Sequence, residues 1–331
     1  MTKIEAARQE YADWCDAIGI TRMSDVTEIL DRGEGIGLIN LCEARQERKY
    51  MEVADQIFWR RKKCRIVMMS GPSSSGKTSS SLRIAQQCRV LGLVPKVIEL
   101  DNYFVNRDLT PKDENGEYDY EHINAMDIEK LNKDLNDLLD GREVELPKFN
   151  FTTGMSEPSG KTMALNDNEC LFMEGIHALN PALTPHIDQS RIFHVYISAL
   201  TALKDGDKDH YSTTDKRLLR RIVRDNRVRN TTPEETILRW PSVRRGEKLN
   251  IFPYEENADI VFNSSTLYDL PLLKYYSEPL LYEISEASPA YEKAQSLLSF
   301  LTTVRALKPS EIAAIPPTSI MREFIGGQKL V

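Results

Sequence analysis

The chain has 331 residues, 41% hydrophobic and 28% charged, which suits one sizeable globular domain with additional elements or two small domains. Its net charge of −7 argues against a general affinity for nucleic acid or anionic membranes, although a local basic patch remains compatible with it. The five cysteines are scattered, no apolar run approaches the roughly 18 residues of a membrane span, and the charged N-terminus lacks a signal-peptide pattern. We therefore expect a reduced, cytoplasmic protein without a membrane span.

The first 61 residues predict a helical region. Ser24 is a candidate cap for a helix that ends near Asp31, and residues 38–63 have the apolar period of a helix. Beyond residue 265 the pattern is helical again, over 266–283 and 288–304. We therefore expect an N-terminal helical region (1–61), a central domain (62–265) and a C-terminal helical extension (266–331).

The central domain alternates short apolar runs with helical stretches, which is typical of an α/β fold with a parallel sheet. The apolar runs are continuous, as expected for strands that are covered on both faces. They lie at residues 65–70, 96–100, 170–174, 192–198 and 259–263, and the helical stretches at 77–91, 125–140 and 215–229. Two further segments, 143–151 and 161–165, predict a β-hairpin arm outside this sheet.

A phosphate-binding loop follows the first predicted strand. Residues 71–78 read Gly-Pro-Ser-Ser-Ser-Gly-Lys-Thr and match G-x-x-x-x-G-K-[ST] between a strand and a helix. Glycines allow successive amides to converge on an anion, and the helix that follows adds the positive end of its dipole. The motif predicts a site for ATP and Mg²⁺, with Thr78 on the metal. Its candidate nucleotide-binding residues are Gly71, Ser73, Ser74, Ser75, Gly76, Lys77 and Thr78.

Two carboxylates end neighbouring strands. Asp101 follows the second predicted strand, where it could accept the proton of an attacking hydroxyl. Glu174 ends the run 170–174 and could hold Mg²⁺ directly or through water. A turn-forming aspartate and an ordinary strand-end acid are the alternatives. The chain lacks a convincing N-K-x-D guanine signature and the strand-end aspartate of motor ATPases, which argues against those two classes.

The helix over 216–229 is strongly basic although the whole chain is acidic. A solvated charged helix is one interpretation. An arginine lid that neutralises a transferring phosphoryl group is the other. The candidate lid residues are Arg220, Arg221, Arg224 and Arg229.

Taken together and in this order, the motifs resemble the uridine kinase/phosphoribulokinase family, closest to its bacterial uridine-kinase-like branch. The matching segments are GPSSSGKT, LDNYF with Asp101, YDYEHINAMD (118–127), LPKFNF (146–151), LFMEG, RLLRRIVRD and ADIVFN (258–263). The resemblance covers roughly residues 62–265.

The resemblance implies a P-loop three-layer sandwich with a five-stranded parallel sheet, a hairpin arm over the acceptor site and a helical lid. By motif position, Asp101 resembles the general base and also a metal-site acid, while Thr78 and Glu174 resemble the Mg²⁺ ligands. Lys77 and Arg224 resemble catalytic cations. Asp119 resembles the acid that holds the ribose hydroxyls, and Phe149 and Phe151 resemble the aromatic residues of the base pocket.

Two departures concern the acceptor. Uridine–cytidine kinases place a tyrosine where Phe149 stands, and a histidine where this chain has Gly154. Two polar contacts to a pyrimidine are therefore missing, and polar contacts give the largest specificity ratios. The identity of the acceptor thus stays open.

The sequence favours a kinase that phosphorylates the primary hydroxyl of a nucleoside, with uridine as the preferred acceptor. The alternatives are a kinase of another small alcohol or sugar phosphate, and an ATP-binding regulatory protein without acceptor phosphorylation. The arm has only Lys148 and Lys161 against three glutamates, which disfavours a sugar phosphate. We expect no nucleic-acid or membrane partner, and the helical ends could support a homo-oligomer.

Overall fold

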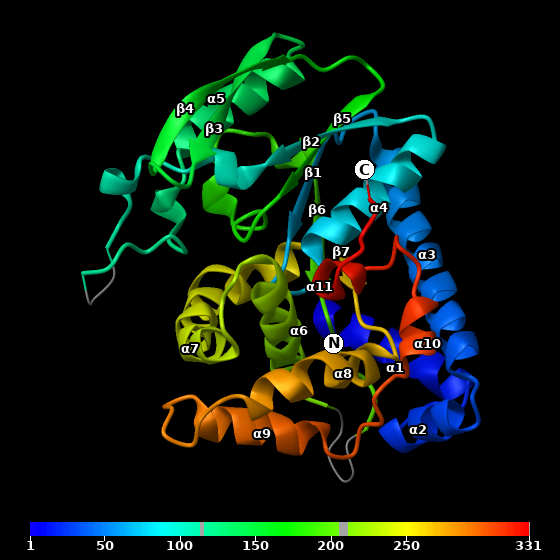
Figure 1. Cartoon of the computed structure of the whole chain (residues 1–331). Coiled ribbons are helices and arrows are strands. Elements are labelled where there is room, and N and C mark those ends of the chain that lie inside the picture. The colour runs from blue at the N-terminus through cyan, green and yellow to red at the C-terminus, as the bar shows by residue number, and fades with distance from the viewer. Residues whose placement is uncertain (113–115, 205–210, 331) are drawn as a thin grey trace.

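A computed structural model describes residues 1–112, 116–204 and 211–330, and its centre is a parallel five-stranded sheet (Figure 1). The strand order is β2-β5-β1-β6-β7. The bounds are β1 Ile66–Ser70, β2 Val94–Glu99, β5 Glu169–Glu174, β6 Ile192–Ser198 and β7 Ile260–Asn263. The predicted α/β fold with five parallel strands is therefore confirmed.

The central strand β1 is buried along its whole length, as its continuous apolar sequence predicts. Its alternate side chains belong to two different cores, because successive residues of a strand point to opposite faces. Ile66 and Met68 lie in one core, and Val67 and Met69 lie in the other. The edge strand β2 differs from the prediction of burial on both faces, since Val94 and Val97 are 37% and 43% exposed. It has β5 as its only strand neighbour in the sheet that the structure describes.

Helices cover both faces of the sheet, which makes three layers. One face packs against α5 (Ile128–Leu139), and the other against α3 (Gly35–Arg60) and α4 (Lys77–Val90). Helix α3 runs alongside α4 (Figure 1). Helices α6 (Thr213–Val228) and α7 (Pro233–Asn250) follow β6, and Thr232 caps α7 in a capping box with Glu235.

The two ends of the chain share a third core with α6. The N-terminal part adds α1 (Lys3–Ala17) and α2 (Met23–Asp31), and the C-terminal part adds α8 (Asp269–Tyr282), α9 (Tyr291–Leu301), α10 (Pro309–Ala313) and α11 (Arg322–Ile325). The prediction that Ser24 caps this helix is wrong, because α2 begins at Met23. Asp25 instead accepts the N–H groups of Thr21 and Arg22. Helix α9 begins three residues later than the Ser288 predicted as its start.

The predicted arm is an antiparallel hairpin of β3 (Val144–Asn150) and β4 (Met155–Met163), separate from the main sheet (Figure 1). Its second strand begins at residue 155 rather than 161, because Asn150 closes a tight turn. The Asn150 carbonyl accepts the Gly154 N–H, and its side-chain oxygen accepts the N–H groups of Thr152 and Thr153.

Short 3-10 helices complete the architecture. They are η1 Leu100–Tyr103, η2 Arg107–Leu109, η3 Ile123–Ala125, η4 Pro181–Leu183, η5 Gln189–Arg191 and η6 Phe252–Asn257. Among the described helices, none is both long and apolar enough to cross a membrane.

Candidate active site

The turn between β1 and α4 has the backbone geometry of an anion-binding nest. Ser74 and Gly76 have positive φ angles of 58° and 85°, which point successive amides toward one side. A left-handed conformation is uncommon for a serine and is retained where the surroundings impose it. The hydroxyls of Ser74 and Ser75 are buried and lack hydrogen-bond partners among the described residues. The loop therefore has donors available for an anionic ligand.

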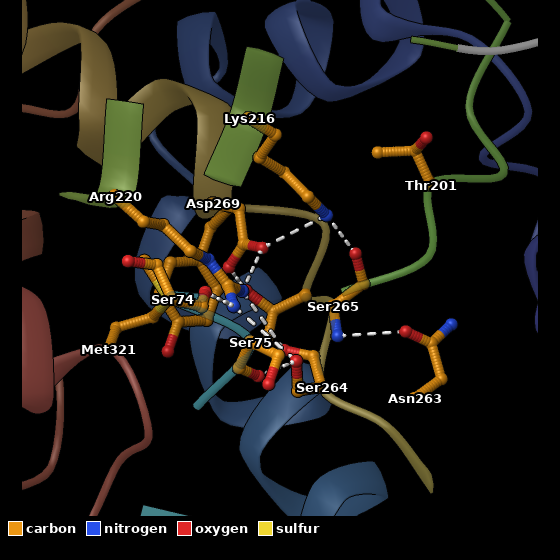
Figure 2. A network of polar contacts seen from close by, with 12 residues as sticks. Ser74, Ser75, Thr201, Lys216, Arg220, Asn263, Ser264, Ser265, Asp269 and Met321 are labelled. Atoms are coloured by element: carbon orange, nitrogen blue, oxygen red, sulfur yellow. Dashed lines mark hydrogen bonds and ion pairs between the residues drawn. The ribbon is translucent and has the colours of Figure 1, made fainter. Parts of the chain in front are cut away.

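Buried polar groups hold this loop from behind, as Figure 2 shows. Arg220 is completely buried, and its guanidinium donates to Asp269 at 2.6 Å and to the Ser264 carbonyl at 3.0 Å. The Ser264 hydroxyl in turn donates to the Ser75 carbonyl at 2.5 Å. Arg220 thus stabilises the loop from its protein side.

Lys77 and Thr78 open α4 at the mouth of the loop. The Lys77 ammonium donates to the Gly71 carbonyl at 2.8 Å, and burial lowers the pKa of Lys77. The Thr78 hydroxyl donates to Glu174 Oε1 at 2.7 Å. Glu174 Oε2 is buried and has no partner in the part of the chain that the structure describes, and burial raises the pKa of Glu174. A hydroxyl beside an unsatisfied carboxylate oxygen is a donor set that fits Mg²⁺.

Asp101 lies in η1, just beyond the carboxyl end of β2. The strand register explains its proximity to the phosphate loop, because Glu174 pairs with Glu99 of β2 on one side and with Met69 of β1 on the other. Burial raises the pKa of the Asp101 carboxyl, while the positive charge of Lys77 acts in the opposite direction. The Asp101 residue is exposed and lines the cavity, so its carboxylate is accessible to an acceptor hydroxyl and could take its proton.

One cavity of about 940 Å³ brings most of the predicted site residues together. Of these residues, its lining contains Ser73, Ser74, Ser75, Gly76, Lys77, Thr78, Asp101, Phe149, Phe151, Glu174, Arg221, Arg224 and Arg229. Three predicted residues lie outside the lining, namely Gly71, Asp119 and Arg220. A Cβ at Gly71 would lie 2.1 Å from the Ile197 carbonyl oxygen, so this glycine permits close packing of the loop. Asp119 instead accepts the Glu121 N–H at 3.0 Å.

Three arginines of the lining, all from the basic segment 216–229, share one buried acid. Asp225 is 3% exposed and lies 3.2 Å from Arg221, 2.8 Å from Arg224 and 3.5 Å from Arg229. Arg221 also donates to the Ser73 hydroxyl at 2.8 Å. The basic helix is therefore not simply a solvated surface, since one face of it reaches the phosphate loop.

Two glutamates of the site were not predicted, because they are remote from the phosphate loop in sequence. Glu247 of α7 accepts the Ser73 N–H at 2.9 Å and pairs with Arg217 at 2.5 Å. Glu323 of α11 accepts the Ser79 N–H at 3.2 Å. Both line the cavity. Neither glutamate was predicted from the sequence.

Aromatic side chains form the wall of the cavity under the hairpin arm. Phe149 is 4% exposed and contacts Phe104 and Phe151 edge-to-face, with ring centroids 5.5 Å and 5.1 Å apart. Phe151 remains 63% exposed at the rim. Planar walls of this kind suit a flat organic ring.

Comparisons with known proteins agree with this geometry. The model of the Phosphoribulokinase / Uridine kinase family matches residues 66–270. The chain is 32% identical to a uridine kinase from Macrococcus caseolyticus over 60% of its own length and 87% of the relative's, and 30% identical to one from Ligilactobacillus salivarius over 59% and 83%.

The chain also has remote matches among solved structures. A putative fructose transport system kinase from Silicibacter sp. TM1040 has a TM-score of 0.45 at 14% identity, covering 64% of this chain and 98% of its own. A possible uridine kinase from Bacillus stearothermophilus has a TM-score of 0.43 at 18% identity, covering 67% and 100%.

Proposed function

The chain belongs to the phosphoribulokinase/uridine kinase family, and from this premise we propose that it is an ATP- and Mg²⁺-dependent nucleoside kinase. The acceptor group is a primary hydroxyl, and uridine is the favoured acceptor. One observation carries this proposal. The acid Asp101, the phosphate loop and the arginines Arg221, Arg224 and Arg229 all line a single cavity. A site for phosphoryl transfer needs these three components within reach of one another.

In this proposal Asp101 orients the acceptor hydroxyl and takes its proton. The loop amides and Lys77 bind the phosphates, and Arg224 and its neighbours stabilise charge on the phosphoryl group in flight. Thr78 and Glu174 would hold Mg²⁺, which supplies charge neutralisation for the phosphates when bound. The phosphates would also draw Lys77 away from the loop carbonyls that it now contacts.

The nucleoside part of the proposal draws support from the aromatic wall and from the relatives that carry the name uridine kinase. Phe104, Phe149 and Phe151 would enclose the base. Asp119 would act on the ribose only through the segment that it fixes, because it lies outside the cavity lining.

The test is an assay of ADP release with ATP, Mg²⁺ and a panel of nucleosides, sugars and sugar phosphates. Release that depends on a nucleoside supports the proposal. Release that depends only on a sugar or sugar phosphate would replace the nucleoside with the alternative acceptor class. Release without any acceptor dependence would favour a nucleotide-binding regulator.

A further inference from the structure

The position that lacks the expected histidine of the arm is occupied by a different side chain. Gly154 has a φ of 74°, and a Cβ built on it would lie 2.8 Å from three atoms of Arg107. Arg107 belongs to η2, which follows Asp101 in sequence and is not part of the hairpin. Glycine at 154 therefore leaves room for an arginine that comes from elsewhere in the chain.

Several contacts fix Arg107 against the arm. Its backbone N–H donates to the Gly154 carbonyl at 2.8 Å, and its Nη2 donates to the Phe151 carbonyl at 2.7 Å. The neighbouring Asn106 side chain accepts the Ser156 N–H at 2.9 Å. Arg107 lines the same cavity as Asp101, and its Nε is buried without a hydrogen-bond partner among the described residues. Arg107 thus retains donor capacity at the arm end of the cavity.

A second polar group lines the cavity beyond the metal-site acid. His177 stands three residues after Glu174 and is only 2% exposed. Neither ring nitrogen reaches normal hydrogen-bond geometry with a residue that the structure describes, and the Glu121 backbone is the polar group that acts on the imidazole. Burial lowers the pKa of His177 to about 4, so the imidazole is neutral and presents one donor and one acceptor. A buried polar group without a partner is costly, and a ligand that bonds to it removes this cost.

The two groups have different chemistry. A guanidinium only donates, so its ligand must offer an electron-rich oxygen or nitrogen. Beside it, the ring wall of Phe104 and Phe149 suits a planar heterocycle. A neutral imidazole suits a hydroxyl, which both donates and accepts.

We propose that Arg107 is a specificity-determining residue of the acceptor site and that His177 is a further acceptor-binding residue. Arg107 reads a carbonyl oxygen on the base, and His177 bonds a hydroxyl of the sugar. This inference rests on the proposed nucleoside kinase activity. It places the polar recognition of the base on the loop after Asp101 instead of on the arm.

The test compares initial rates for uridine, cytidine and inosine, which carry a base carbonyl, with those for adenosine, which does not. Arg107→Ala should raise KM for the first three about 10- to 100-fold, as loss of a charge-assisted hydrogen bond predicts. KM for adenosine and for ATP should change less than about threefold, and Arg107→Lys should restore only part of the loss. Arg142→Ala is the matched control, since Arg142 pairs with Asp137 and Asp140 on the surface.

Substitutions at two glycines distinguish recognition of the base by Arg107 from a purely structural role of this residue. Gly154→Ala and Gly160→Ala place a Cβ at similar positive φ angles, but nothing lies within 4 Å of the Cβ at 160. Of the two variants, only Gly154→Ala should displace Arg107. It should raise KM selectively for the nucleosides that carry a base carbonyl. An equal rise in KM for all nucleosides in both Gly154→Ala and Arg107→Ala would reduce Arg107 to a support for the arm and overturn its reading role.

His177→Leu keeps a buried apolar volume and removes both ring nitrogens. It should lower kcat/KM for every nucleoside about 10-fold with KM for ATP unchanged, and His177→Asn should recover part of the loss. Unchanged nucleoside kinetics in His177→Leu would overturn the role of His177. A wild-type enzyme without activity on any nucleoside would instead refute the proposed function, so the two failures are distinguishable.

Discussion

The carboxylate of Glu323 accepts hydrogen bonds from both the backbone N–H and the hydroxyl of Ser79, at 3.2 Å and 2.5 Å. Ser79 is the third residue of α4, so its N–H is one of the free donors at a helix N-terminus, where anions bind. Gln328 donates to the same hydroxyl at 2.6 Å, and the C-terminus of the chain lies beside α4 (Figure 1). A carboxylate from the C-terminal extension therefore lines the cavity beside the phosphate loop.

Removal of this negative charge should strengthen ATP binding. Glu323→Gln keeps the size of the side chain and eliminates the repulsion of a nearby polyphosphate, so we expect a Kd for ATP about 3- to 10-fold lower. Isothermal titration calorimetry measures it directly. Glu283→Gln, at the exposed end of α8, is the control and should leave the Kd unchanged. Weaker ATP binding in Glu323→Gln would mean that the carboxylate supports the loop rather than competing with phosphate.

Loss of the proposed base should affect turnover without affecting nucleotide binding. Asp101→Asn preserves shape and hydrogen bonding but cannot accept a proton, so we expect kcat to fall roughly 10²- to 10⁴-fold. The Kd for ATP should stay within about twofold. Asp108→Asn, at an exposed position of η2, provides the control for a nearby loss of charge. A normal kcat in the Asp101 variant would remove this residue from the mechanism.

Asp225 should matter for both folding and activity, because it is the shared partner of Arg221, Arg224 and Arg229. Asp225→Asn leaves three neighbouring positive charges without their common anion. We expect a loss of about 1–2 kcal/mol in the free energy of unfolding, which is below the cost for a fully buried pair because the arginines are partly solvated. We also expect kcat to fall about 10-fold or more, since the guanidinium groups are no longer held in place.

The matched control for Asp225 is Asp137→Asn. Asp137 pairs with Lys133 and Arg142 at the protein surface, where solvent screening makes the contribution of such pairs to stability small. Urea denaturation and steady-state kinetics of both variants separate the two environments. Equal, small effects in both variants would show that the Asp225 cluster is no more than a surface ion pair.

His177 should make the protein sensitive to acid. Burial lowers its pKa to about 4, whereas an unfolded histidine titrates near about 6.5. Between these values the unfolded chain binds a proton that the folded chain does not, so stability falls as the pH drops from about 6.5 to 4. The full effect corresponds to about 3 kcal/mol.

His177→Leu should remove this contribution, so its free energy of unfolding should vary less between pH 7 and pH 4.5 than that of the wild-type protein. Urea titrations at a series of pH values measure the difference. His186→Asn, at a site that is 61% exposed, should retain the wild-type dependence. A pH dependence unaltered by His177→Leu would contradict the neutral, buried state of this histidine.

The local sequence determined the parts of the site whose geometry depends on neighbouring residues. The glycine spacing of 71–78 specified the phosphate loop, and strand-end positions specified Asp101 and Glu174, because a parallel sheet brings the carboxyl ends of its strands to one edge. The helical period placed Arg220 and Arg224 on one face. The helical period does not predict that Arg220 is buried and pairs with Asp269, whereas Arg224 lines the cavity.

Only the tertiary structure decided which distant groups complete the site. Glu247 and Glu323 contact loop residues from helices that lie far along the chain, and Arg107 occupies the space above Gly154 through packing between separate elements. Such contacts depend on how elements pack rather than on residue spacing, so no pattern in the sequence encodes them. The start of the second hairpin strand could likewise not be predicted from local sequence, because the hairpin register depends on pairing between two strands.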